Sequence, residues 1–317
     1  MKKFMLVCCA IATVFLAGCA KKEAPAAATT PSFKIGYCIN NFNDTFQTYI
    51  VDACEKYLAA NHPEVEFITA DAREDVIQQQ DQINSLITQG VNALIVVPVD
   101  TSAMAPITKA AEEAGIPICY VNRNPYGESN PPANVYYVGS QEVTAGEMQM
   151  NYIGEKLGGR GGVGILQGIL SNEGAVKRTE GNENVINSKY PEITVLAKET
   201  GNWQRDQGLN IVQNWLTAYG TQLNAVLANN DEMALGAYRA LAEAGRTDVL
   251  VIGVDGIPDA IASIENGELS GSVLQDATGQ GQGAAKTIMA ALSGKTPDPV
   301  TWVDFKLITP ENVAEFK

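Results

Sequence analysis

From Phe33 to the end of the chain, short β-branched runs alternate with stretches of helical periodicity, and this alternation constrains the fold more than any other feature. The apolar runs cover residues 33–39, 66–70, 93–97, 116–121, 135–138, 162–166, 193–197, 225–228, 249–254 and 272–274. The helical patterns cover residues 48–61, 76–89, 103–114, 142–157, 176–188, 205–219, 233–244, 258–265 and 280–292. Continuous apolar strands that alternate with helices indicate parallel sheets covered on both faces. The predicted fold class is therefore doubly wound α/β.

One strand–helix–strand unit occurs twice, once in each half of the chain. In the first half an apolar run leads to Asp100, a helical pattern and Gly115, and in the second half to Asp231, a helical pattern and Gly245. Each Asp stands where it could cap the start of the helix, and each Gly where it could end it. The shared spacing predicts two homologous lobes, with a ligand crevice between them at the carboxyl ends of the strands.

The beginning of the chain has the pattern of an export signal. Residues 1–18 combine two lysines with an apolar run that is shorter than the ~20 residues of a membrane-spanning helix. The run ends in Leu16-Ala17-Gly18-Cys19, which resembles a bacterial lipobox; an ordinary signal with an accidental cysteine is the alternative. Residues 19–32, rich in Ala, Thr and Pro, predict a flexible tether. We therefore expect an exported protein on the periplasmic or extracytoplasmic face, held at the membrane only through lipid on Cys19.

Charge and composition exclude several classes of function. Without its first 18 residues the chain keeps 20 of its 22 basic residues against 36 acidic ones, a net charge of −16, so we expect no nucleic-acid partner. His62 is the only histidine, which argues against zinc sites and Cys–His nucleophiles. We expect three buried thiols, at Cys38, Cys54 and Cys119; one disulfide among them is the alternative.

Polar and aromatic side chains follow the predicted strands at their carboxyl ends. A hydroxyl group is both donor and acceptor, so Asp, Asn, Gln and Arg side chains can each engage two neighbouring hydroxyls. Aromatic rings pack on the apolar faces of a sugar ring. Each such residue alone is more often a turn or cap residue, but the whole array predicts a site for a sugar or cyclitol. The array comprises residues 40–46, 122–125, 172, 178, 201–203, 229–231, 255–256 and 275–276.

Three of these segments resemble the type I periplasmic binding proteins of the ribose/galactose cluster, and the resemblance extends over residues 33–317. They are Asn122-Arg123 and residues 228–237 and 252–259. The resemblance implies two Rossmann-like lobes, joined by three crossings of the chain, that close on a ligand about a hinge. The N-terminal lobe would hold residues 33–138 and 276–298, and the C-terminal lobe residues 139–275 and 299–317.

The resemblance also assigns ligand-binding residues. Seven match positions that contact sugar in the glucose/galactose binders: Asp44, Phe46, Asn122, Arg178, Trp203, Asn230 and Asp255. Three more candidates depart from that type: Gln275 replaces an Asn, Arg123 matches an Arg of the ribose type, and Asn172 replaces a His. Gly174 stands where the hexose type has an Asp, and this difference argues against an unaltered preference for hexoses. Residues 157–161 lack the carboxylates of that type's calcium loop, so we expect no metal and no cofactor.

Within the cluster the chain is similar above all to the inositol and rhizopine binders, through residues 41–46, 121–123, 178–181, 214–217, 275–281 and 307–312. This implies a monomeric, lipid-anchored substrate-binding protein of an ABC importer that takes a monosaccharide or cyclitol and meets permease subunits. The alternative is a glucose/galactose- or ribose-type binder that also serves a chemotaxis or sensory receptor. A repressor would need a basic helix-turn-helix at its N-terminus, and an enzyme would need a catalytic pattern that the residues do not offer. We therefore predict a binding protein and no enzyme.

Overall fold

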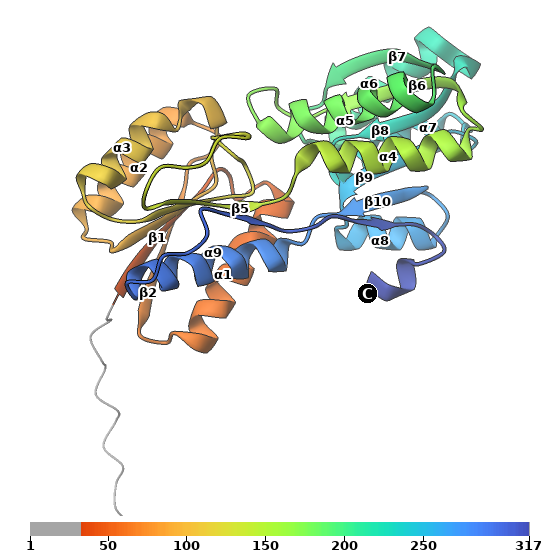
Figure 1. Cartoon of the computed structure of the whole chain (residues 1–317). Coiled ribbons are helices and arrows are strands. Elements are labelled where there is room, and N and C mark those ends of the chain that lie inside the picture. Colours follow the sequence, from red (N-terminus) through yellow and green to blue (C-terminus); the bar gives the residue numbers. More distant parts are fainter. Residues whose placement is uncertain (1–32, 317) are drawn as a thin grey trace, which may run out of the picture. The chain divides into compact units, whose positions relative to one another are not determined.

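The computed structural model describes residues 33–316 of the chain (Figure 1). The predicted signal peptide of residues 1–18, the predicted tether of residues 19–32 and the predicted lipid attachment site, Cys19, lie outside the described residues. Within residues 33–316, none of the helices has the length and apolar character that a membrane crossing requires.

Two six-stranded sheets with equivalent strand orders form two lobes. The first has the order β11 (Val300–Trp302), β5 (Val135–Gly139), β4 (Ile118–Val121), β3 (Ala93–Val96), β1 (Phe33–Ile39), β2 (Val65–Asp71). The second has the order β12 (Lys306–Ile308), β10 (Gly271–Leu274), β9 (Leu250–Asp255), β8 (Leu223–Ala228), β6 (Arg160–Gln167), β7 (Glu192–Thr200). The strand pairs are parallel apart from β10 and β12. The predicted α/β class and the pair of similar lobes are confirmed.

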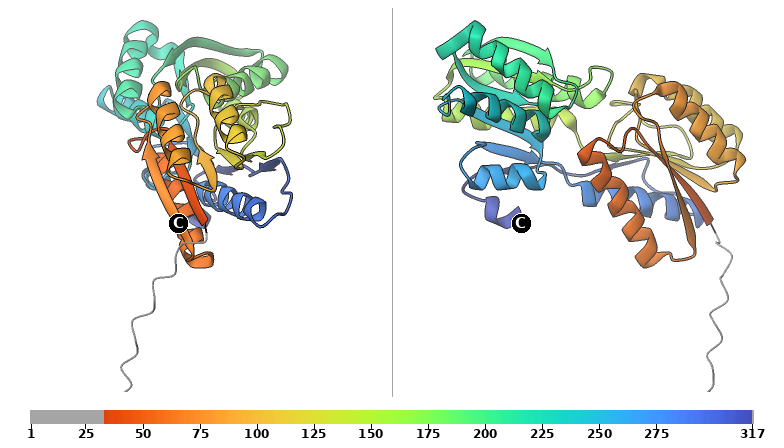
Figure 2. Two further views of the ribbon diagram at one scale, coloured as in Figure 1. Left: turned by 90° about the vertical axis from the view of Figure 1, so that its left-hand side faces the viewer. Right: turned by 180° about the vertical axis from the view of Figure 1, so that it is seen from behind.

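Helices cover both faces of each sheet (Figures 1 and 2). In the first lobe α1 (Thr45–Asn61) and α9 (Ala277–Leu292) cover one face, and α2 (Val76–Thr88) and α3 (Ala105–Glu113) the other. In the second lobe α4 (Glu142–Lys156) and α5 (Glu173–Lys189) lie opposite α6 (Arg205–Tyr219), α7 (Asp231–Glu243) and α8 (Pro258–Glu265). Short 3₁₀ turns occupy Thr101–Ala103, Gly220–Gln222 and Val313–Phe316. Because both faces are buried, Tyr37 of β1 packs in the core under α1 while its neighbour Cys38 packs in the opposite core.

The chain passes between the two sheets after β5, after β10 and between β11 and β12. The predicted boundary at residue 299 placed all later residues in the C-terminal lobe. The structure corrects this, because β11 pairs with β5 in the first sheet, with Val300 beside Tyr137. The third crossing therefore lies between Trp302 and Lys306. Neither β11 nor β12 was predicted, since each has only three residues and so leaves no periodic signal.

Capping residues set the starts of several helices two or three positions earlier than the apolar periodicity predicts. Asp100 was predicted to cap the helix that follows it, but it caps the preceding 3₁₀ turn of residues 101–103, by accepting a hydrogen bond from the Ser102 amide, and α3 begins only at Ala105. The prediction that Asp231 caps a helix is wrong. Asn230 is the cap of α7, and its Oδ1 accepts from the Met233 amide at 3.0 Å. Asp231 is instead the first helical residue, and its side chain is fully buried.

Two glycines let α4 and α5 approach closely. A Cβ atom on Gly181 of α5 would collide with the carbonyl oxygen of Val143, and one on Gly146 of α4 would collide with that of Arg178. Only glycine therefore permits this helix contact. The contact brings the first turn of α4, with Glu142, against the middle of α5, with Arg178.

Three cysteines lie in the first lobe as free, buried thiols: Cys38, Cys54 and Cys119. Burial raises the pKa of the Cys38 thiol to about 12, so it stays protonated at neutral pH. The structure agrees with three buried thiols and not with the alternative of a disulfide among them.

Candidate functional site

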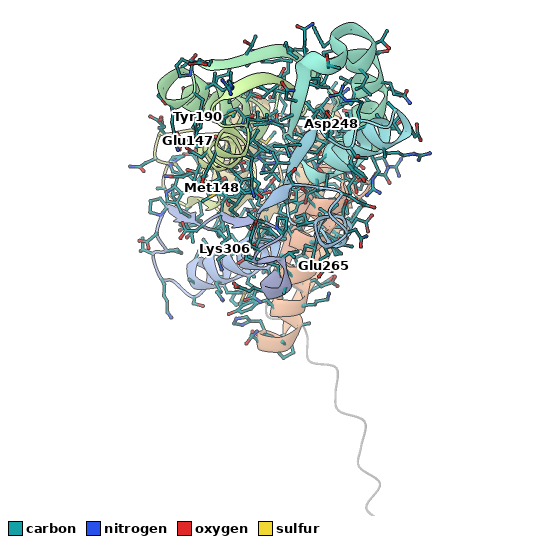
Figure 3. The ribbon with its side chains drawn as sticks, turned by 90° about the vertical axis from the view of Figure 1, so that its right-hand side faces the viewer. Glu147, Met148, Tyr190, Asp248, Glu265 and Lys306 are labelled. Carbon is teal, nitrogen blue, oxygen red and sulfur yellow. The ribbon has the colours of Figure 1, made fainter. Side chains whose placement is uncertain are left out.

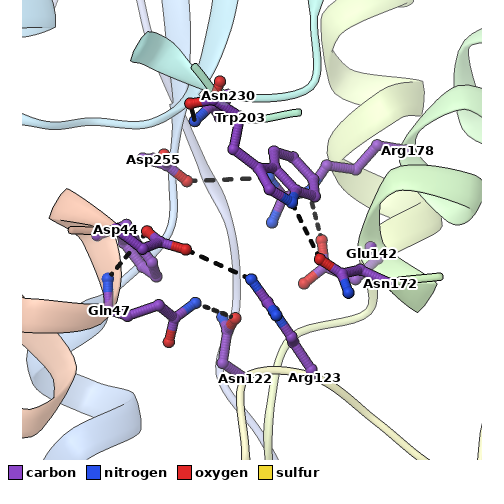
Figure 4. Close-up of a pocket in the computed structure, with 12 residues that line it drawn as sticks. Asp44, Gln47, Asn122, Arg123, Glu142, Asn172, Arg178, Trp203, Asn230 and Asp255 are labelled. Atoms are coloured by element: carbon purple, nitrogen blue, oxygen red, sulfur yellow. Dashed lines mark hydrogen bonds and ion pairs between the residues drawn. The ribbon is translucent and has the colours of Figure 1, made fainter. Parts of the chain in front are cut away.

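A pocket lies between the two lobes and takes side chains from both (Figure 4). The twelve residues that line it are Asp44, Phe46, Gln47, Asn122, Arg123, Glu142, Asn172, Gly174, Arg178, Trp203, Asn230 and Asp255. Asn122 and Arg123 directly follow β4, and Asp255 is the last residue of β9. Several others stand in the first turn of a helix: Phe46 and Gln47 in α1, Glu142 in α4 and Gly174 in α5. In each sheet the second strand along the chain pairs on one side of the first, β1 or β6, and the third strand pairs on its other side, so the strand order reverses there. Open α/β sheets bind ligands at the carboxyl ends of the strands at such a reversal.

The first lobe contributes a carboxylate, a guanidinium and two amides. Arg123 is buried, and its Nη1 donates to the carbonyl oxygen of Pro98 at 2.9 Å while its Nη2 lies 3.4 Å from Oδ2 of Asp44. Gln47 Nε2 donates to Oδ1 of Asn122 at 2.7 Å. Burial raises the pKa of the Asp44 carboxyl, and the charge of Arg123 opposes that rise. Contacts within the protein thus hold the polar ends of these side chains in place.

Arg178 is the centre of the second lobe's contribution, and it is only 5% exposed. Its Nε donates to Oε2 of Glu142 at 2.6 Å, and its Nη2 to Oε1 of Gln275 at 3.2 Å. Its Nη1 donates to the carbonyl oxygen of Asn229 at 2.6 Å and lies 3.8 Å from Oδ1 of Asp255. Burial raises the pKa of Asp255 well above its ordinary value, and the charge of Arg178 opposes that rise.

Three neighbours hold Trp203 in place, two through its ring and one through its backbone. Its Nε1 donates to Oδ1 of Asn172 at 3.0 Å, and the guanidinium of Arg178 lies 5.8 Å from the ring centre (Figure 4). Asn230 Nδ2 donates to the Trp203 carbonyl oxygen at 3.2 Å, which supports a left-handed backbone with φ of 66°. Phe46 supplies the second ring from the opposite lobe. A flat ligand can therefore meet an aromatic surface on each lobe.

Direct hydrogen bonds join the lobes beside the pocket. Asn172 Nδ2 donates to the carbonyl oxygen of Val99 at 2.8 Å, so this one amide connects Trp203 with the backbone of the first lobe. Thr45 Oγ1 donates to Oε1 of Glu232 at 3.1 Å. These contacts depend on the closeness of the lobes, so they would break if the lobes moved apart.

Nine of the ten predicted ligand-binding residues line this pocket. Gln275 does not; it lies behind Arg178 and also donates from Nε2 to Oε1 of Glu142 at 3.1 Å. Two lining residues with side-chain polar groups, Gln47 and Glu142, were not predicted. Gln47 could have been found from the sequence, because it lies three residues after the helix cap Asp44 and so stands in the first turn of α1, next to a predicted site residue. No sequence pattern pointed to Glu142, because its position in the pocket depends on how α4 packs against α5.

Comparisons with known proteins place the chain in a family. Residues 35–296 match the periplasmic binding protein domain. A Rhizobium meliloti protein named for rhizopine binding is 40% identical over 286 residues, which are 89% of this chain and 92% of that protein. The xylitol-binding protein of Mycolicibacterium smegmatis is 37% identical over 90% of this chain and 80% of its own length.

Solved structures of similar proteins lead to the same family. A solute-binding protein of an ABC transporter from Bacillus halodurans, with bound myo-inositol, superposes with a TM-score of 0.84 and 37% identity over 92% of this chain and 99% of its own. The chain therefore belongs to the periplasmic binding protein family, among its type I sugar-binding members. Since the relatives are solute-binding proteins, the prediction that the chain is not an enzyme is confirmed.

Glu173 stands beside the pocket in an unusual electrostatic position. It is the first residue of α5, and its Oε2 is buried with no hydrogen-bond partner among the described residues. Burial, followed by the negative charge of Glu142, raises the pKa of Glu173 to about 8, and Arg178 and Lys177 oppose the rise. At neutral pH the folded protein therefore keeps a proton that the unfolded chain releases.

We expect this proton to make the stability of the protein depend on pH. An unfolded Glu titrates near ~4.3, so between that pH and about 8 the folded state binds more protons, and the free energy of unfolding falls as the pH rises. Glu173→Gln should flatten this fall in urea unfolding measured from about pH 5 to pH 8. Glu183→Gln, on the same helix but partly exposed in an ion pair with Lys198, should keep the wild-type slope. An unchanged slope in Glu173→Gln would contradict the assignment.

Proposed function

We propose that this protein is the substrate-binding protein of an ABC importer and binds a monosaccharide or cyclitol, most suitably an inositol-like one, between two closing lobes. One observation carries the proposal. Each lobe presents a carboxylate beside a buried guanidinium to the same pocket, Asp44 with Arg123 and Asp255 with Arg178, and each adds an aromatic ring.

This arrangement suits a ligand with hydroxyls around a ring. A carboxylate accepts from one hydroxyl while the neighbouring guanidinium donates to the next, so a vicinal pair satisfies both. A missing or inverted hydroxyl would leave one of these buried groups unpaired, at a cost of ~1–3 kcal/mol. The pocket would therefore discriminate strongly between stereoisomers.

An inositol-like ligand is supported by the relatives and by one departure from the hexose type. The Bacillus halodurans relative holds myo-inositol, and two other relatives are named for rhizopine and xylitol. In the position where the glucose/galactose type has a His, the Asn172 amide is bonded to Trp203 and Val99. A glucose/galactose- or ribose-type binder that also serves a sensory receptor is the second candidate.

Binding would proceed by closure of the lobes. The ligand first meets the groups of one lobe, and the second lobe then completes its hydrogen bonds. Closure is a population shift, set by the ligand's higher affinity for the closed state. The contacts of Asn172 with Val99 and of Thr45 with Glu232 would add to the stability of that closed state.

The proposal extends to where the protein works. We infer that it is exported, that Cys19 carries a lipid anchor, and that the closed monomer meets permease subunits of the importer. The lipobox-like residues 16–19 and the similarity to a solute-binding protein of an ABC transporter support this.

Calorimetry with myo-inositol tests the ligand site. Asp255→Ala and Trp203→Ala should each weaken binding by at least about a hundredfold, or about 2.8 kcal/mol, through unpaired hydroxyls and a lost ring contact. Asp248→Ala is the control, because Asp248 lies exposed on the surface in an ion pair with Arg246 (Figure 3). Wild-type affinity in both pocket variants would refute this placement of the site.

The anchor has its own test. Cys19→Ser should move the protein from the membrane fraction to the soluble fraction of fractionated cells, because the lipid-bearing thiol is gone. Cys9→Ser, within the apolar run of the signal, should leave the protein in the membrane fraction. If Cys19→Ser stays with the membrane as the wild type does, the proposed anchor is wrong.

A further inference from the structure

Asp231 is a buried carboxylate that does not line the pocket and is nevertheless surrounded by donors. Its side chain is 0% exposed. Its Oδ2 accepts from the backbone amides of Gly256 at 2.7 Å and Ile257 at 3.0 Å, and its Oδ1 accepts from the Ser272 hydroxyl at 2.7 Å. All three donors belong to β10 or to the turn between β9 and α8, whereas Asp231 itself begins α7.

The turn held by Asp231 begins with a residue of the pocket. Asp255 is the last residue of β9 and lines the pocket, with a φ of 130°, and Gly256 follows with a φ of 71°. An Asp in this left-handed region is strained, and such a conformation persists only where surrounding contacts hold it. The bonds from the two amides that follow Asp255 to a single carboxylate are contacts of this kind.

Gly253 of β9 leaves the space that the Asp231 carboxylate occupies. A Cβ atom on Gly253 of β9 would collide with Oδ1 of Asp231, so only glycine leaves the space. The two amides that bond to Asp231 belong to Gly256 and Ile257, which both precede Pro258, the first residue of α8. Asp231 therefore holds, from another helix, the backbone of the turn itself and not the first turn of α8.

We propose that Asp231 is a positioning residue of the ligand site: its carboxylate holds the turn of residues 255–257 in the conformation that points the Asp255 carboxylate into the pocket beside Arg178. This inference rests on the proposed function for its ligand, but it concerns how the site is built. If Asp231 served only the stability of the fold, its loss would lower stability without a specific effect on Asp255.

A double-mutant cycle separates these two roles. Asp231→Asn keeps the shape of the side chain but replaces one acceptor oxygen with an NH2 group that faces donors. With myo-inositol as the probe in calorimetry, we expect Asp231→Asn to weaken binding at least about tenfold in the wild-type background. In an Asp255→Asn background the same change should weaken binding less than about threefold, because the group it positions is already altered.

A matched cycle uses the carboxylate of the other lobe. In an Asp44→Asn background, Asp231→Asn should again cost about tenfold, since Asp44 does not depend on the 255–257 turn. Equal losses in all three backgrounds, or no loss in the wild-type background, would overturn the proposal. Should Asp231→Asn fail to fold, Ser272→Ala removes the bond to Oδ1 and the 3.2 Å bond that the Ser272 hydroxyl accepts from the Gly256 amide. It leaves both amide bonds to Oδ2 of Asp231 and should show a smaller loss with the same dependence on Asp255.

A crystal structure of Asp231→Asn gives a readout that needs no ligand. We expect Asp255 to leave its left-handed conformation and its carboxylate to turn away from Arg178, while Asp44 and Arg123 keep their places. An unchanged Asp255 would overturn the positioning role even if myo-inositol does not bind. Failure of the wild type to bind myo-inositol, together with a displaced Asp255 in the variant, would instead refute the proposed ligand and leave the positioning role supported.

Discussion

The burial of the Arg178 guanidinium is the interaction on which the rest of the site depends. A buried charge is tolerated only when it is paired and hydrogen-bonded, and loss of one partner of such a pair costs ~3–5 kcal/mol. Arg178 meets this requirement through Glu142, which follows the first crossing of the chain, and Gln275, which stands at the start of the second. This pocket-lining arginine is thus bonded directly to residues at two of the three crossings between the lobes.

The same arrangement recurs in simpler form across the pocket. Arg123 is satisfied by backbone carbonyl oxygens and by Asp44, so the first lobe also presents a prearranged pair of charges. The repeated sheet topology explains the correspondence, because each lobe brings the carboxyl ends of its strands to the same crevice. Fixed polar groups lose little side-chain entropy on binding, which favours affinity for a small, rigid polyol.

Much of the fold could be predicted from the sequence, because apolar strands and amphipathic helices leave periodic signals. The three-residue strands β11 and β12 leave none, and helix starts were placed late because caps such as Asn230 stand outside the apolar pattern. The pocket residues were found through strand ends and a family resemblance. The roles of Asp231 and Glu142 were not predicted, because they depend on contacts between distant elements. Asp231 bonds to the turn after β9, and Glu142 meets Arg178 through the packing of α4 on α5.

The central claim is that the two lobes together enclose a polyol, and a crystal structure of the protein with myo-inositol tests it most directly. The account predicts a ring in contact with Phe46 and Trp203, with hydroxyls within hydrogen-bonding distance of Asp44 and Arg123 on one side and of Asp255 and Arg178 on the other. A pocket that stays empty at saturating myo-inositol, or a ligand bound to an outer face of one lobe, would contradict it.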